Sequence, residues 1–133
     1  MTKERVLEKL ASYQQALSRL EEALAEKEPD QFVYDATIKR FEFTYELSWK
    51  LLKAFIEYKG GEDVRFPRDV FKEAYAKGIV KNGEIWLDML EDRNLTSHTY
   101  SFARASEIYK RVKDKYYEEF IKLKATIEGE MKE

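Results

Sequence analysis

The sequence predicts an all-α fold, an up-and-down helical bundle of about five helices, three of them long and two short. The main observation is that apolar residues recur at steps of three and four near both ends of the chain. A second observation is that glycine and proline stand chiefly between the periodic segments. The length of 133 residues suits one compact domain, so residues 1–133 are expected to form a single bundle.

The first long helix is expected over about residues 3–27. Its apolar stripe steps by four and three residues and consists of Val6, Leu10, Tyr13, Leu17, Leu20 and Leu24. Pro29 lies just beyond this stripe, at a place where a helix commonly stops.

The second long helix is expected over about residues 30–59, with Asp30 as its N-cap and two glycines after its end. Apolar and polar residues alternate from Phe41 to Trp49, which is the period of a strand. Helix is preferred because no turn signal interrupts the segment and because it is too long for a strand. On a helix these aromatic residues surround most of the cylinder, which favours a core or subunit-interface position. A base-stacking platform is the weaker alternative.

Two short helices and a third long one complete the prediction. Pro67 suits the first turn of one short helix and Gly78 suits its end, while Asn82 is a candidate N-cap for the next. The last helix has Ser101 as its best N-cap candidate. Its stripe consists of Phe102, Ala105, Tyr109, Val112, Tyr116, Phe120, Leu123 and Ile127.

Composition excludes several classes of function. The net charge of −2 lacks the basic field of a general nucleic-acid binder. The absence of cysteine and the single histidine argue against metal sites, and no cofactor is expected. No apolar run approaches the ~20 residues that span a membrane, so a cytoplasmic protein without a membrane partner is expected. Phosphate-binding loops are absent as well, so the chain is not a self-sufficient nucleotidyltransferase or kinase.

The segment 93–100 is the candidate chemical site. It contains the only histidine, His98, five residues after Arg93 and two before Tyr100. A loop between two helices allows Arg93 and His98 to converge, and the start of the last helix offers N–H groups to a phosphate. Arg93 and that helix end disfavour a protonated imidazole, so His98 suits a base and Arg93 a phosphate ligand. The hydroxyl of Tyr100 can donate, accept or be modified. Further polar residues that suit orienting a ligand are Asn94, Thr96 and Ser97.

Ordinary structural roles remain open for the same residues. A histidine in an interhelical loop is commonly a capping residue, and Arg93 commonly forms a surface ion pair, here with Glu91 or Asp92. The acidic residues Asp88, Glu91 and Asp92 would gather a cation only as a weaker alternative, because carboxylates at helix ends are commoner than metal sites.

Three segments, 41–50, 67–71 and 86–100, resemble the nucleotidyltransferase substrate-binding proteins, in the HepT-like branch of the HEPN superfamily. The resemblance covers nearly the whole chain in the same order. It implies a helical homodimer and a partner, a minimal nucleotidyltransferase encoded by an adjacent gene. Related pairs are toxin–antitoxin systems in which the helical chain is the toxin, often an RNA endonuclease, and the nucleotidyltransferase adds AMP to its motif tyrosine.

Carried over residue by residue, the resemblance matches Arg93 and His98 to the catalytic pair of HEPN ribonucleases and Tyr100 to the AMP acceptor. Asn94 matches the polar residue that commonly follows the arginine, and Asp92 is expected to support the site. Three functions follow as expectations. They are a noncatalytic partner of a nucleotidyltransferase that serves as a toxin, a metal-independent endoribonuclease with RNA or a nucleotide as ligand, and a structural dimer without chemistry.

Overall fold

The computed structural model describes residues 2–97 and 101–132, and its regular elements within these ranges are all helical. The elements are α1 (Lys3–Leu24), α2 (Gln31–Tyr58), α3 (Pro67–Ala76), α4 (Gly83–Leu95), α5 (Phe102–Arg111), the π-helical segment η1 (Val112–Tyr116) and α6 (Tyr117–Glu130). Because α5, η1 and α6 follow one another without a break, the described residues form five continuous helices. The predicted all-α class and the three long and two short helices are therefore confirmed.

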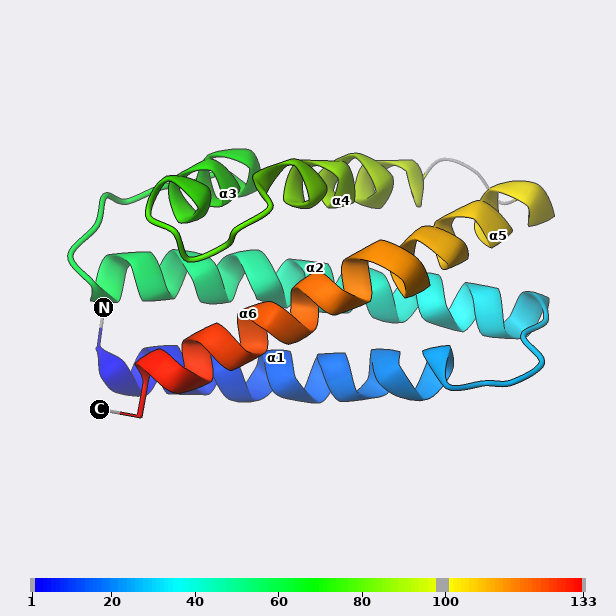
Figure 1. Ribbon diagram of the computed structural model, residues 1–133, viewed down its shortest axis with the longest axis horizontal. Coiled ribbons are helices and arrows are strands. Elements are labelled where there is room, and N and C mark those ends of the chain that lie inside the picture. Colours follow the sequence, from blue (N-terminus) through cyan, green and yellow to red (C-terminus); the bar gives the residue numbers. More distant parts are fainter. Residues whose placement is uncertain (1, 98–100, 133) are drawn as a thin grey trace.

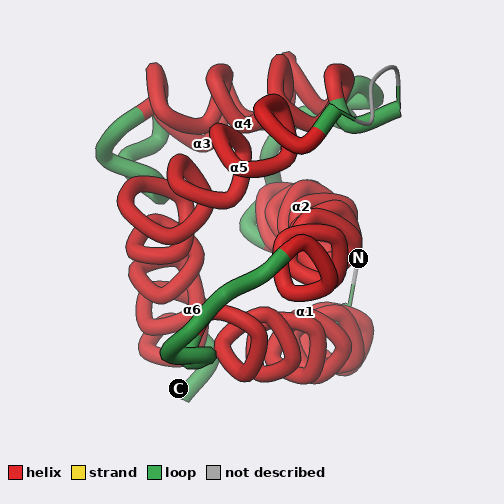
Figure 2. The backbone as a smooth tube through the Cα atoms, turned by 90° about the vertical axis from the view of Figure 1, so that its right-hand side faces the viewer, coloured by secondary structure: helices red, strands yellow, loops and turns green. Residues whose placement is uncertain are grey.

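The chain runs up and down along one long axis (Figure 1). Helices α1 and α2 lie antiparallel, α3 and α4 follow each other along one side, and the α5–α6 helix returns obliquely across the bundle. Viewed end-on, the helices surround a common interior, with α6 beside α1 and with α3 and α4 above α2 (Figure 2). This path brings the end of α4 and the start of α5 to one end of the bundle, opposite the two termini.

The caps predicted for the helices are largely those observed. The side chain of Asp30 accepts a hydrogen bond from the Val33 N–H at 3.0 Å, and that of Ser101 accepts one from the Arg104 N–H at 3.1 Å. Helix α2 ends before Gly60, whose φ of 83° is one that glycine adopts without strain. Helix α1 ends at Leu24, about one turn earlier than predicted.

The alternating segment 41–49 lies within α2, so the preference for helix over strand is confirmed. Helix α2 contacts α1, α3, α4 and α5, which explains why apolar residues surround so much of it. Phe41 and Tyr45 are buried in the core, while Trp49 is half-buried. Phe43 is the exception, because 54% of it stays exposed.

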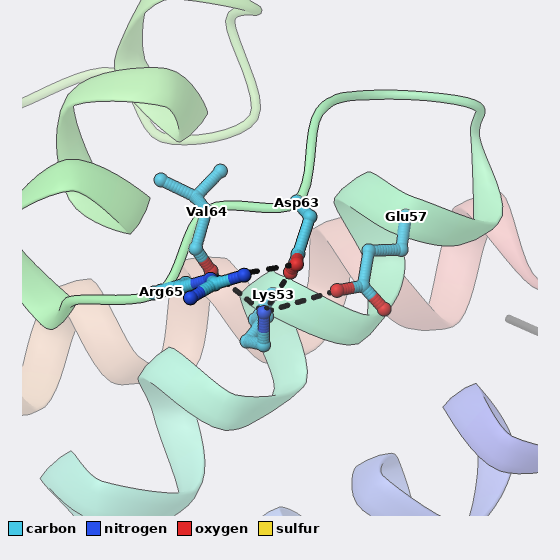
Figure 3. A network of polar contacts seen from close by, with 5 residues as sticks. All are labelled: Lys53, Glu57, Asp63, Val64 and Arg65. Atoms are coloured by element: carbon cyan, nitrogen blue, oxygen red, sulfur yellow. Dashed lines mark hydrogen bonds and ion pairs between the residues drawn. The ribbon is translucent and has the colours of Figure 1, made fainter.

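Lys53 binds the connection between α2 and α3 to the side of α2 (Figure 3). Its ammonium lies 2.6 Å from Asp63 Oδ1 and 3.0 Å from Glu57 Oε1, and donates to the Val64 carbonyl at 2.7 Å. The hydrogen bond from Lys53 lowers the pKa of the Asp63 carboxyl, and the same contact raises the pKa of Lys53. These contacts hold the connection between α2 and α3 against α2, so that α3 starts beside the end of α2.

The π-helical segment η1 lies where the last helix changes its neighbours. Helix α5 packs on α2, η1 contacts α4, and α6 packs on α1. The sequence stripe predicted a continuous helix here, and the wide turn inside it was not predicted. A π turn adds one residue to a helical turn and is frequent at functional sites. None of the helices in the described ranges is long and apolar enough to cross a membrane.

Tyrosines buried in the core make the stability of the fold sensitive to alkali. The Tyr13 hydroxyl donates to the Phe120 carbonyl at 2.6 Å across the bundle. Burial is the main cause that raises the pKa of Tyr13, and it also raises the pKa values of Tyr45 and Tyr116. The folded protein thus holds these phenolic protons more tightly than the unfolded chain does.

The free energy of unfolding is expected to be unaffected by these tyrosines below pH about 10 and to fall as the pH rises further. One tyrosine with a raised pKa contributes a slope of up to about 1.4 kcal/mol per pH unit. Urea unfolding followed by circular dichroism at pH about 8 to 11 measures this slope. Tyr13→Phe should make it shallower, whereas Tyr75→Phe, at an exposed tyrosine, should not. Equal slopes in the two variants would contradict the assignment.

Candidate functional site

The last turn of α4 carries the described part of the candidate site. Arg93 lies in this turn, and Thr96 and Ser97 follow where the helix ends. The Thr96 hydroxyl donates to the Arg93 carbonyl at 2.7 Å, and the Ser97 hydroxyl donates to the Asn94 carbonyl at 2.8 Å. These bonds satisfy carbonyls that the end of a helix leaves without a partner. The other two candidates, His98 and Tyr100, lie outside the described residues.

The Arg93 side chain is held against α2. Its Nε lies 3.9 Å from Oε1 of Glu46, and the other oxygen of Glu46 accepts a hydrogen bond from the Trp49 indole at 3.1 Å. Within the described part of the chain, this buried Nε has no hydrogen-bond acceptor. The guanidinium, 28% of whose side chain is exposed, is therefore oriented by charge and packing, with donors available for a phosphate. The ion-pair partner of Arg93 is Glu46. The ordinary structural role considered from the sequence, a surface ion pair with Glu91 or Asp92, is therefore wrong in its partner.

Arg93 borders a hollow of about 310 Å³ between α2 and the end of α4. Thr96 and Ser97 line the same hollow, so the structure brings three of the predicted site residues together. From α2 the hollow receives one basic side chain and two acidic ones, Lys39, Asp35 and Glu42. The exposed Asn94 is not among its lining residues. A phosphate in this hollow would be attracted by two cations, Lys39 and Arg93. The carboxylates of Asp35 and Glu42 would repel a ligand with more negative charge.

Asp92 lies on another face of α4 and is buried in the bundle interior. Its carboxylate accepts two hydrogen bonds from the Arg111 guanidinium, at 2.7 and 2.9 Å, and one from the Tyr116 hydroxyl at 2.5 Å. These bonds raise the pKa of Arg111, and burial followed by the bond to Asp92 raises that of Tyr116. Asp92 therefore anchors the last turn of α4 to the end of α5 and to the π segment, and its support of the site stays a prediction.

Sequence reasoning did not single out Glu46, Arg111 or Tyr116 as partners of the site. Each lies far along the chain from the residue that it binds, and no local spacing connects the two. As for a cation site, no group of three acidic, histidine or cysteine side chains able to hold a metal ion occurs among residues 2–97 and 101–132. The carboxylate of Asp92 is occupied by Arg111 and Tyr116.

The chain is thus a helical bundle with an arginine in the last turn of its fourth helix and a His-x-Tyr sequence beyond that helix. Residues 8–129 match the model of one family, described as nucleotidyltransferase substrate binding protein like. The chain belongs to this family, which confirms the resemblance found in the sequence.

Among curated proteins, the chain is similar to one from Haemophilus influenzae named "Probable ribonuclease HepT". The two are 32% identical over 81 residues, which are 58% of this chain and 56% of that protein. The match thus spans little more than half the length of this relative. A solved structure from Thermus thermophilus is 30% identical, with a TM-score of 0.76, and the alignment covers 91% of this chain and 99% of that one.

Two further structures share the fold at lower identity. One is a mutant of the toxin–antitoxin pair MntA–HepT, with 16% identity, a TM-score of 0.77 and coverage of 93% and 97%. The other is the tri-AMPylated HEPN toxin of Shewanella oneidensis in complex with its MNT antitoxin, with 16% identity, a TM-score of 0.75 and coverage of 93% and 96%. At this identity, the likeness establishes a shared fold.

Proposed function

We propose that this chain is the HepT-like toxin half of a toxin–antitoxin pair. In this role it is the noncatalytic partner of a minimal nucleotidyltransferase, which AMPylates it on Tyr100. The family match over residues 8–129 carries the proposal, because it extends through the whole motif from Arg93 to Tyr100. The toxin names of proteins that share the fold support it.

The modification is a simple group transfer. The phenolic oxygen of Tyr100 attacks the α-phosphorus of ATP, an oxygen–phosphorus bond forms, and pyrophosphate leaves as the bond to the β-phosphate breaks. The phenolic proton passes to a base on the nucleotidyltransferase or to water. This chain has no phosphate-binding loop, so the partner supplies the nucleotide site. The product places a bulky anion two residues after His98 and blocks access to it.

Co-expression with the cognate nucleotidyltransferase tests the proposal through the intact mass of this chain. We expect a gain of one or more AMP units that is lost in Tyr100→Phe. Tyr75→Phe, at an exposed tyrosine on α3, is the matched control and should keep the gain. If the wild-type chain forms a stable complex but stays unmodified, it is a binding partner that is not AMPylated. If the mass gain persists in Tyr100→Phe, Tyr100 is not the acceptor.

Metal-independent cleavage of RNA is the second candidate function. The observation that favours it is the Arg93 guanidinium beside a hollow, oriented by Glu46. In this reaction His98 takes the proton of a ribose 2′-hydroxyl, the 2′-oxygen attacks the adjacent phosphorus, and the 5′-oxygen leaves with a proton from solvent. Arg93 stabilises the extra negative charge on the phosphate oxygens. AMPylated Tyr100 would stop this activity.

A homodimer is proposed as the functional unit, because two copies of the motif would then form a composite cleft. A structural dimer without chemistry is the third candidate. It differs from the others in a clear way, since His98→Ala and Tyr100→Phe would then change neither growth nor partner binding.

A further inference from the structure

Phe43 is the aromatic residue of segment 41–49 that remains exposed outside the core. Phe43 is 54% exposed on α2, although both its neighbours in the alternation, Phe41 and Tyr45, are buried. The ammonium of Lys39 lies 5.2 Å from the centroid of the Phe43 ring. Lys39 also lines the hollow beside Arg93, so the exposed ring and the candidate site share a neighbour.

The ring of Phe43 lines an open groove of about 680 Å³ between α1 and α2. Three basic side chains line this groove, Arg19 from α1 and Arg40 and Lys50 from α2. Glu46, which pairs with Arg93, lines it as well. The groove and the Arg93 hollow are therefore neighbours along α2, linked by the contact of Lys39 with Phe43 and by the ion pair of Glu46 with Arg93.

The charge of this region differs in sign from that of the whole protein. Three basic side chains, Arg19, Arg40 and Lys50, and one acidic side chain, Glu46, line the groove, in a chain with a net charge of −2. The Arg40 guanidinium donates to the Arg19 carbonyl at 2.7 Å and lies 3.8 Å from Glu22, which fixes it across the groove. A guanidinium has five N–H donors, so the bond to the Arg19 carbonyl uses only part of its capacity.

We infer that the groove between α1 and α2 binds a single strand of RNA next to the Arg93 hollow. Phe43 stacks on a base, and Arg19, Arg40 and Lys50 contact the phosphates. An exposed aromatic ring beside a row of basic side chains is the combination that binds single strands with little sequence preference. The biological meaning of this inference rests on the ribonuclease activity proposed above, whereas its test does not.

The test measures binding of a fluorescent 2′-O-methyl RNA of about 12 nucleotides, a length within the ~4–16 nucleotides of known single-strand sites. This probe has no 2′-hydroxyl and cannot be cleaved by the proposed reaction. Fluorescence anisotropy should show binding by the wild type and about tenfold weaker binding by Phe43→Ala. Phe66→Ala is the matched control, because Phe66 is 66% exposed and lies outside the groove. It should bind as the wild type does.

Salt dependence tests the phosphate contacts. Between about 50 and 200 mM salt, Lys50→Gln should lower the slope of log K against log salt by about 0.7, the value for one contact to a single strand. Lys132→Gln, at an exposed lysine outside the groove, should not change it. Circular dichroism establishes that each variant is folded.

Three outcomes would overturn the inference: no binding by the wild type, binding by Phe43→Ala and Lys50→Gln equal to that of the wild type, or a loss of self-association in Phe43→Ala by light scattering. The last would assign the groove to a second copy of this chain. Cleavage of unmodified RNA, measured in parallel, separates the two hypotheses. Groove-dependent binding without cleavage removes the ribonuclease alone, and cleavage that tolerates both substitutions removes the groove alone.

Discussion

His98→Ala is expected to lower the rate of RNA cleavage by a factor of about 10² to 10⁴, the usual contribution of a general base. The reason is that no other imidazole exists in the chain to take the 2′-hydroxyl proton. The measurement is a time course of cleavage of a labelled single-stranded RNA in the presence of a chelator. Growth arrest on expression of the wild type should be relieved by the same substitution.

The control for this experiment is Asp88→Asn, an exposed position on α4 that does not line the Arg93 hollow. It should cleave RNA at the wild-type rate. Arg93→Lys should lose activity in part, because a lysine keeps the charge but not the planar set of donors. Wild-type cleavage by His98→Ala would remove the proposed mechanism, whatever the outcome for the AMPylation of Tyr100.

Arg111→Met is expected to lower the free energy of unfolding by about 3 kcal/mol, because it leaves the buried carboxylate of Asp92 without its cation. Asp92 is only 8% exposed as a side chain, whereas Arg111 is one-third exposed. The expected loss is therefore placed at the lower end of the range for buried pairs. Urea unfolding at neutral pH measures it. The same substitution should loosen the last turn of α4 and hence the position of Arg93.

Lys113→Met is the matched control, since it removes an exposed cation from the π segment next to Arg111. Its effect should stay within about 0.5 kcal/mol. The double variant Asp92→Asn, Arg111→Met should be more stable than Arg111→Met alone, because no charge is then left unpaired. An Arg111→Met protein as stable as the wild type would show that water solvates Asp92, and that the pair does not hold α4.

Local sequence signals predicted the helices because the caps and apolar spacing of each helix depend on residues close together in the sequence. Asp30 and Ser101 cap as expected, and Phe41 to Trp49 form a helix because their length and lack of turn residues outweigh a period of two. The π turn was not predictable, since the two steps of four between Val112, Tyr116 and Phe120 suit an unbroken α-helix equally well.

The candidate site was predictable to a smaller extent. Arg93, Thr96 and Ser97 lie together because they are neighbours on one helix end. The pairing of Arg93 with Glu46 and of Asp92 with Arg111 depends on how helices pack, and mixed charges on every helix offered many equivalent partners. Phe43 was grouped with the core aromatics because its spacing is theirs, and only the packed bundle distinguishes it.

The wide turn at η1 has a consequence for the number of residues in the last helix. Removing one residue from a helix rotates everything beyond it by about 100° relative to what precedes it. If residues 112–116 were shortened to an ordinary α-helical turn, Arg111 and Phe120 would no longer point toward Asp92 and the aromatic core together. The last helix is thus two helices joined out of phase, and the count of residues between them, as much as their identity, keeps both halves aligned.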